Sequence, residues 1–409
     1  MKKDIVIIVD MVSTGSYYPE RIKKLGVEKV YVLQSMKEYP NSLQMSPNEY
    51  VDEIFTSTEE CIQAIKEDNV LAVIPGSELG VILAEELANK LRLENSNNIK
   101  TSAVRRDKLL MQKKLKESGL RYIKFCLIDS PDSIDKVKEF LEINNSEYFI
   151  IKPVDSAGSD SVMRLNKHEV ISAINELPWG KKNAIGGTYN NFILQEFING
   201  VEYVVDLVAH KNEFYIASVC KYKKITLNNS DFVYDSLIVM DPKNVMVSAL
   251  IEYAKKASRA LDVKVGPVHM ELMMDTNSND VVMIEAGARM HGGIAPLLFE
   301  NCYSKGLVEM SVDSYLNRGE FKDVELVENG RISFLSAEEE GIAKELSDSE
   351  MNSLRAIEGF KGVKLFYKKG DKVSKTVDLN TCLGIIYFSH TSASVIERSV
   401  DCARNIILK

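Results

Sequence analysis

The stretch VVMIEAGARMHGG, residues 281–293, is the most informative part of the chain. An apolar run of strand character delivers a carboxylate, Glu285, and is followed by Arg289 and a pair of glycines. Fourteen residues before Glu285, a second carboxylate, Glu271, interrupts the apolar run VHMELMM at residues 268–274. Burying two carboxylates in strands is unfavourable unless positive charge lies between them, and a magnesium ion bound to phosphates supplies such charge.

The composition limits the class of protein. With 409 residues and 45% hydrophobic content, the chain is long enough for two or three domains with buried cores. Its formal net charge of -8 argues against a general nucleic-acid-binding protein, whose surface would carry a basic face. A local basic pocket for a nucleotide is compatible with that charge. We therefore expect small-molecule substrates and no nucleic-acid partner.

The cysteines and the N-terminus indicate the compartment. The six cysteines show no C-x-x-C spacing, so we expect reduced, buried thiols of a cytosolic protein rather than disulfides or zinc ligands. The apolar run at residues 5–9 is closed by Asp10 and is too short for the core of a signal peptide. We expect no membrane-spanning segment and a cytoplasmic location. The cysteines are Cys61, Cys126, Cys220, Cys302, Cys382 and Cys402.

Residues 1–101 alternate short apolar runs with helical patterns, which is typical of a doubly wound α/β domain with a parallel sheet. No G-x-G-x-x-G follows the first strand, so the phosphate-binding turn of a dinucleotide site is missing. Ser77 is expected to cap a helix and Glu78 to bind its first-turn amides; contact of Glu78 with a substrate ammonium is the alternative. The predicted strands are residues 5–9, 29–33 and 70–74, and the predicted helices are residues 18–25, 58–66 and 78–91.

Two further units are expected, at residues 102–318 and 319–409. The first begins with a long helix from Ser102 to Gly119 and contains a small α+β subdomain at about 122–207. The second is a small C-terminal α/β module. Other predicted helices are residues 133–141, 242–261, 347–355 and 394–407, and other predicted strands are residues 148–153, 192–198, 331–337, 359–367 and 383–389.

A lysine and a small-residue loop predict an anion site. Lys152 ends an apolar strand, where its ammonium group is desolvated unless it meets an anion. The loop DSAGSDSV at residues 155–162 follows, and its small residues let successive backbone amides approach a phosphate chain. A hairpin turn without a ligand is the alternative. Lys108, on a helix rich in lysine and arginine, is by itself expected to be a solvated charge.

The segment QEFINGVE at residues 195–202 is the next candidate. A strand that ends in an irregular turn exposes backbone N–H and C=O groups, and adenine presents a matching donor and acceptor edge. Glu202, just past the glycine, is suited to accept both ribose hydroxyls. The alternative is a β-hairpin with a solvated acid at its tip.

Glu271 and Glu285 are candidate ligands of magnesium, which prefers carboxylate and phosphate oxygens. Arg289 has a planar fork suited to a phosphate or a carboxylate. The glycines at residues 292–293 would let a backbone lie against a ligand and would open the next helix. Two histidines flank the acids, and each is either a structural residue or a substrate contact. The histidines are His269 and His291. Gly292 is a further candidate for contact with the substrate.

Taken together, these residues resemble the ATP-grasp superfamily of carboxylate–amine ligases, and within it the bacterial L-amino acid ligases that make dipeptides. The resemblance covers roughly residues 102–317. It implies an ATP-grasp fold of mixed α/β and α+β class: an N-terminal α/β domain, a small lid subdomain, a central antiparallel sheet and a C-terminal module. The positions that match ATP contacts are Lys108 and Lys152 on the phosphates, Ser156, Gly158, Ser159 and Ser161 in the lid loop, Glu196, Phe197 and Ile198 in the hinge, and Glu202 on the ribose.

The resemblance also implies an activity. ATP and Mg²⁺, with Mn²⁺ as an alternative, would convert a substrate carboxylate into an acyl phosphate, with Lys152 and Arg289 as catalytic residues. An amine would then displace the phosphate. Amino acids are the implied substrates and a homodimer the implied assembly. Many members carry an asparagine metal ligand where this chain has Gly287. Ligation of another carboxylate to an amine, and a non-catalytic ATP-binding regulator, are the alternatives.

Overall fold

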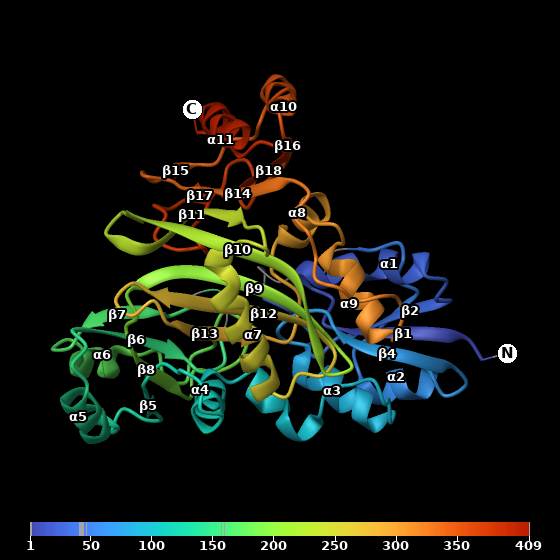
Figure 1. Cartoon of the computed structure of the whole chain (residues 1–409), viewed down its shortest axis with the longest axis horizontal. Coiled ribbons are helices and arrows are strands. Elements are labelled where there is room, and N and C mark those ends of the chain that lie inside the picture. Colours follow the sequence, from blue (N-terminus) through green and yellow to red (C-terminus); the bar gives the residue numbers. More distant parts are fainter. Residues whose placement is uncertain (1, 41–44, 46, 157, 159, 409) are drawn as a thin grey trace.

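The computed structural model describes the whole chain except residues 1, 41–44, 46, 157, 159 and 409. Its N-terminal part, on the right of Figure 1, is a four-stranded parallel sheet with helices packed around it. Apolar side chains fill β1 because helices and the neighbouring domain cover both faces of the sheet. The strand order is β3 (Glu53–Phe55), β2 (Lys29–Leu33), β1 (Asp4–Val9) and β4 (Asn69–Pro75), and the helices are α1 (Tyr18–Lys24), α2 (Thr58–Ala64) and α3 (Val81–Lys90).

Two helix predictions near this sheet are wrong. The helix expected from Glu78 begins at Val81, with Gly80 at its N-cap, so Glu78 lies in the loop after β4. The long helix expected from Ser102 is interrupted: a 3₁₀ helix, Ile99–Arg105, precedes α4 (Lys108–Glu117). The carboxylate of Asp107 accepts the N–H of Leu110 at 2.9 Å and so caps α4. Lys108 is therefore the first residue of its helix.

The lid sheet, at the lower left of Figure 1, is an antiparallel sheet in the order β5-β8-β6-β7. Two helices cover one face and share an apolar core with it, including Phe149 and Phe192. The elements are β5 (Phe125–Ile128), α5 (Ile134–Ile143), β6 (Tyr148–Pro153), β7 (Met163–Asn166), α6 (Val170–Glu176) and β8 (Phe192–Glu196).

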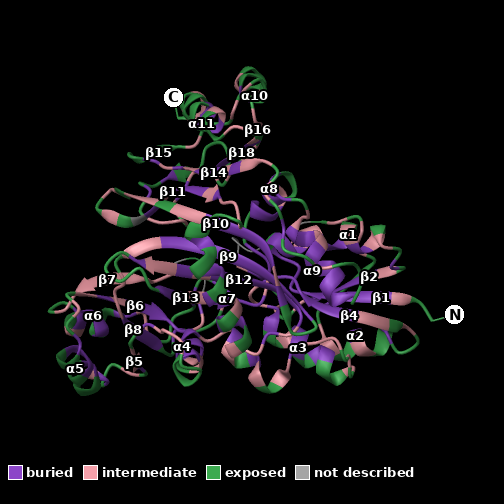
Figure 2. Cartoon of the chain, in the orientation of Figure 1, coloured by how far each residue is buried: buried purple, intermediate pink, exposed green. Residues whose placement is uncertain are grey.

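An eight-stranded antiparallel sheet forms the centre of the molecule, and Figure 2 shows it as the main buried region. Since β8 belongs to the lid sheet and β9 to the central sheet, the hairpin considered around Gly200 is wrong. The sheet order is β13 (Val281–Gly287), β12 (Gly266–Asp275), β9 (Gly200–His210), β10 (Glu213–Leu227), β11 (Ser230–Val239), β14 (Asn329–Leu335), β18 (Gly384–His390) and β16 (Phe360–Leu365).

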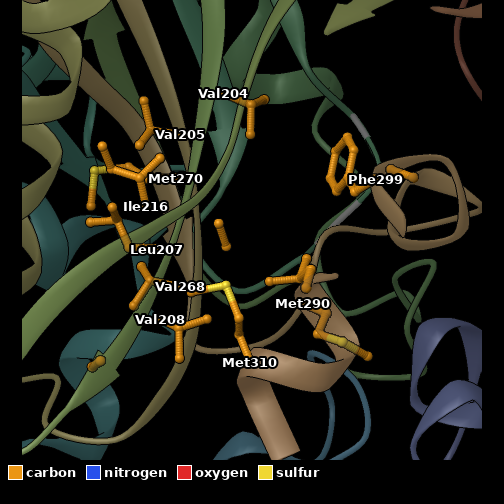
Figure 3. Packing of buried hydrophobic residues seen from close by; sticks show 14 of the residues in the cluster. Val204, Val205, Leu207, Val208, Ile216, Val268, Met270, Met290, Phe299 and Met310 are labelled. Atoms are coloured by element: carbon orange, nitrogen blue, oxygen red, sulfur yellow. The ribbon is translucent and has the colours of Figure 1, made fainter. Parts of the chain in front are cut away.

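Helices pack against the central sheet and bury its apolar side chains. In Figure 3, Val208 and Val268 of the sheet lie close to Met310, with Met290 and Phe299 nearby in the same cluster. Dispersion contacts of this kind hold β9 and β12 in fixed register, which also fixes the polar side chains on the other face of the strands. The helices are α7 (Ser248–Ala260), α8 (Ala295–Cys302) and α9 (Leu307–Tyr315).

The last ninety residues form the top of Figure 1, where three strands extend the central sheet. The proposed boundaries at 101/102 and 318/319 stay predictions. Five cysteines are buried as expected, but Cys402 is exposed, because it lies away from the buried side of its helix. None of the described helices is long and apolar enough to cross a bilayer. The remaining elements are β15 (Gly341–Ile342), α10 (Asp348–Arg355), β17 (Lys372–Val373) and α11 (Ala393–Ile407).

Candidate active site

The two predicted acids face each other. In the antiparallel pair of β12 and β13, Glu271 lies directly opposite Glu285. The neighbours of Glu271 in its strand, Met270 and Leu272, are fully buried in the core, so the alternation of the strand turns Glu271 toward the opposite face. Both carboxylates are about a quarter exposed. The acids therefore share one cleft, as the sequence predicts.

The two predicted lysines converge on these acids. Lys108 Nζ lies 3.1 Å from Glu285 Oε2, and Lys152 Nζ lies 3.4 Å from the backbone oxygen of Ile284. Both side chains are buried, so the expectation of a solvated charge at Lys108 is wrong. Burial, assisted by the charge of Lys108, lowers the pKa of Lys152 to about 8 against the opposing pull of Glu285 and Glu271. The two ammonium groups supply positive charge where phosphates would need it.

A cavity of about 540 Å³ lies between the lid sheet and the central sheet and contains most of the predicted nucleotide contacts. Ser161 is not among its lining residues; its hydroxyl instead lies 3.0 Å from the hydroxyl of Tyr189. Ser159 falls outside the described residues. The predicted residues that line the cavity are Lys108, Lys152, Ser156, Gly158, Glu196, Phe197, Ile198, Glu202, Glu271 and Glu285.

The hinge after β8 forms one wall of the cavity. The N–H groups of Glu196 and Phe197 are bonded to the carbonyls of Lys124 and Tyr148, at 3.1 and 3.0 Å. The N–H of Ile198 has no acceptor within the described part of the chain. It is thus available to an external acceptor, such as a ring nitrogen of a base.

Glu202 also lines the cavity, but it is not the solvated acid of a hairpin. Its carboxylate is buried, pairs with Lys224 at 2.6 Å and accepts a hydrogen bond from Tyr234 at 3.3 Å. Burial raises its pKa, and the Lys224 charge opposes that effect. Contact with a ribose stays a prediction.

Glu78 does not cap a helix, because it lies in the loop before α3. Its carboxylate accepts a hydrogen bond from Arg289 Nε at 2.9 Å and forms an ion pair with Arg106. Burial opposes ionisation, but the charges of the two arginines hold the pKa of Glu78 at about 2. The capping role expected for Ser77 is also wrong, because its buried hydroxyl lacks a hydrogen-bond partner among the described residues. Arg106 was not predicted, since nothing in its local sequence indicates that it faces a loop twenty-eight residues earlier.

Gly287 leaves room for this ion pair. A Cβ atom at this position would lie 2.6 Å from Glu78 Oε2 and 3.3 Å from Arg289 Nε. Any side chain here, asparagine included, would displace the Glu78 carboxylate. Gly287, at the position where the resemblance implies an asparagine, thus leaves room for the Glu78 carboxylate. By contrast, a Cβ atom added to Gly292 or Gly293 would meet no described atom within 4 Å, and the helix that follows begins at Ala295.

The two histidines meet at a buried carboxylate that the sequence did not indicate. His269 Nδ1 and His291 Nδ1 lie 2.8 and 2.9 Å from the two oxygens of Asp206. Burial lowers the pKa of His269, but its hydrogen bonds to Asp206 and Glu271 outweigh that effect and raise the pKa to about 9. Burial lowers the pKa of His291, against the charge of Asp206. Neither histidine lines the cavity, so their role as substrate contacts stays a prediction.

The acids fit a magnesium ion. Glu271 Oε1 is near His269 and Glu285 Oε2 is near Lys108, whereas the second oxygen of each carboxylate has no partner in the described part of the chain. Two such oxygens on adjacent strands, open to a cavity with lysines, match the preference of magnesium for a few carboxylates plus phosphate oxygens. Glu271 and Glu285 are the residues that would hold the ion.

Part of the chain matches a known protein family, and one relative is similar to the chain over nearly its whole length. Residues 146–296, from just before β6 to the start of α8, match the family described as the ATP-grasp domain. Dapdiamide A synthase from Enterobacter agglomerans is 24% identical over 415 residues, which cover 99% of this chain and 96% of that protein. The matched domain contains Lys152, Glu271 and Glu285.

Solved structures show the same fold. The L-amino acid ligase from Bacillus licheniformis superposes with a TM-score of 0.75 at 18% identity, over 99% of this chain and 97% of that one. N5-carboxyaminoimidazole ribonucleotide synthetase from Thermus thermophilus superposes with a TM-score of 0.71 at 15% identity, over 99% of both chains. The predicted fold, of mixed α/β and α+β class, is confirmed.

Proposed function

We propose that the chain is an ATP-grasp enzyme of the carboxylate–amine ligase kind, and that it joins two L-amino acids in an amide bond with the release of ADP and phosphate. The nucleotide would lie between the lid sheet and the central sheet. The observation that carries the proposal is the pairing of Glu271 with Glu285 at the cavity wall, within reach of Lys108 and Lys152. The names of the similar dapdiamide synthase and L-amino acid ligase support amino acids as substrates.

Each charged group has a role in this scheme. Lys108 and Lys152 would bind phosphate oxygens, and Ile198 would offer its N–H to the base. A magnesium ion on Glu271 and Glu285 would neutralise charge that develops during phosphoryl transfer. With these groups fixed before reaction, catalysis rests on positioning and electrostatic stabilisation. The lid sheet would exclude water, which would otherwise hydrolyse an activated acyl phosphate.

The arginines favour a carboxylate as the activated group. Arg106 and Arg289 share a single carboxylate, that of Glu78, so the group carries a surplus positive charge. A guanidinium binds a carboxylate or a phosphate through two parallel hydrogen bonds. The surplus charge would attract the substrate carboxylate and steady it once it is phosphorylated. The alternative expected for Glu78, contact with a substrate ammonium, stays a prediction.

Phosphate release measured across a matrix of amino-acid pairs tests the proposal. We expect ADP and phosphate only when a suitable pair is present, together with a dipeptide detected by mass spectrometry. Glu285→Gln is the control, because it should abolish the stimulation while the protein stays folded. If no pair stimulates release, amino-acid ligation is excluded, and a panel of other carboxylates and amines becomes the next test.

The structural similarity to a carboxyaminoimidazole synthetase keeps ligation of another carboxylate as the second candidate. A non-catalytic regulator would bind ATP and turn over nothing. The open carboxylate oxygens and both lysines favour an enzyme over a regulator. The cytoplasmic location and the homodimer stay predictions.

A further inference from the structure

A continuous set of contacts runs behind the cavity wall. The hydroxyl of Tyr222 lies 3.4 Å from His291 Nε2, and His291 Nδ1 lies 2.9 Å from Asp206 Oδ2. On the other side of the carboxylate, His269 Nδ1 lies 2.8 Å from Asp206 Oδ1, and His269 Nε2 lies 3.5 Å from Glu271 Oε1. Both ends of the set, Tyr222 and Glu271, line the cavity.

The fold fixes this arrangement. Asp206 on β9 lies opposite His269 on β12, and Glu271 follows two residues later on the same face of that strand. His291 comes from the loop after β13, where its ring contacts Phe299 at 5.4 Å between centroids. Asp206 is only 1% exposed, so it cannot reach a ligand itself. Asp206 can therefore influence a bound ligand only through the imidazoles of His269 and His291.

Asp206, His269 and His291 could together act as metal ligands, because their ligand atoms lie within 4.8 Å of one another. The geometry favours hydrogen bonds instead. Each imidazole Nδ1 is at hydrogen-bond distance from its own oxygen of Asp206, and the hydroxyl of Ser218 also donates to that carboxylate. Donated protons thus surround the carboxylate, and an ion would have to displace them.

We propose that Asp206 is a positioning residue that orients Glu271 through His269, and Tyr222 through His291, for binding of a magnesium–nucleotide complex. A histidine held from behind by a carboxylate has one defined ring orientation, so its remaining N–H can hold a metal-binding carboxylate in one rotamer. Glu285 is steadied differently, by Lys108. This inference rests on the proposed nucleotide site and is independent of which substrates are joined.

Isothermal titration with ADP, in excess MgCl₂ and in EDTA, tests the proposal with two variants. Asp206→Asn keeps the shape of the side chain but removes one acceptor oxygen, and His269→Gln keeps Asp206 while removing the imidazole link. For both we expect affinity in magnesium to fall about 10- to 100-fold, the range for loss of a group that orients a metal ligand. Affinity in EDTA should stay within about twofold of wild type, a difference of about 0.4 kcal/mol. Higher MgCl₂ should restore binding.

Ser218→Ala is the matched control, because it also removes a hydrogen bond to Asp206 but leaves both imidazoles in place. It should bind ADP as wild type does in both solutions. If folded His269→Gln keeps wild-type affinity in magnesium, or loses affinity equally in magnesium and EDTA, the positioning role is excluded. Should Asp206→Asn fail to fold, His269→Gln decides alone. A wild-type protein that binds ADP no better with magnesium would overturn the magnesium assignment of Glu271 and Glu285, and the positioning role with it.

Discussion

Two neighbouring arginines pair with two acids of the N-terminal domain, and the two pairs differ in how completely they are satisfied. Arg105 binds both oxygens of Glu85, at 2.8 and 2.6 Å, and also donates to backbone carbonyls around it. Its side chain is 1% exposed. Arg106 shares Glu78 with Arg289, and the Arg106 and Glu78 side chains are 12% and 16% exposed.

We propose that this difference separates a structural ion pair from a functional one. In the Glu85–Arg105 pair, one acid matches one base and the remaining donors meet carbonyls, so nothing is left for a ligand. At Glu78, two guanidiniums meet one carboxylate, and we propose that the second positive charge serves to bind a substrate anion. Substitutions in the first pair should therefore change stability, and substitutions around the second should change activity.

The largest expected effect is on stability. Arg105→Met leaves Glu85 and several carbonyls buried without a partner, and the free energy of unfolding should fall by about 3–5 kcal/mol. Chemical denaturation measures it. The double variant Glu85→Leu with Arg105→Met removes the unpaired charge and should recover part of the loss. A loss below about 1 kcal/mol in the single variant would mean that the pair is not structural.

Glu285→Gln should have the largest effect on catalysis. The substitution keeps the shape of the side chain but removes the charge that would hold magnesium, and turnover should fall about 100- to 1,000-fold. The free energy of unfolding should change by no more than about 0.5 kcal/mol, since the carboxylate is partly exposed. Undiminished turnover would contradict the metal assignment.

Arg106→Gln should lower kcat/KM about tenfold to 100-fold, the range for loss of a hydrogen bond between charged groups. Steady-state kinetics over the concentration of the activated amino acid measures it. Lys100→Gln, on the preceding 3₁₀ helix, is a charge-matched control that should have no effect. If Arg106→Gln and Lys100→Gln have the same kcat/KM, Arg106 is not part of the substrate site.

The pH dependence of nucleotide binding should show the smallest effect. Because the pKa of Lys152 is lowered to about 8, this side chain loses its positive charge as the pH rises through that value. The affinity for Mg–ADP should fall about fivefold between pH 8 and pH 9, in proportion to the charged fraction. Lys152→Arg keeps its charge, so its affinity should stay flat over this range. A flat wild-type profile would exclude titration of Lys152.

The sequence predicted what local pattern controls. The apolar runs around Glu271 and Glu285 predicted two strands; both strands form, and their pairing brings the two acids together. It did not predict Arg106 or Asp206, whose roles depend on partners far away in the chain, such as His291 eighty-five residues after Asp206. No local pattern encodes which loops will meet.

The predicted ends of a helix are wrong where side chains hydrogen-bond to the backbone. The predicted helix through residues 102–119 is broken because Asp107 caps the next helix and Arg105 turns inward to Glu85. Similarly, the hairpin considered as the alternative around Gly200 does not form, because its two strands join different sheets. Both outcomes are decided by tertiary contacts rather than by local propensity.

A crystal structure with Mg²⁺ and ADP tests the central claim most directly. We expect a metal ion about 2.1 Å from carboxylate oxygens of both Glu271 and Glu285, with the phosphates against Lys108 and Lys152. A nucleotide bound outside the cavity between the lid sheet and the central sheet, or a metal ion that touches neither acid, would contradict it.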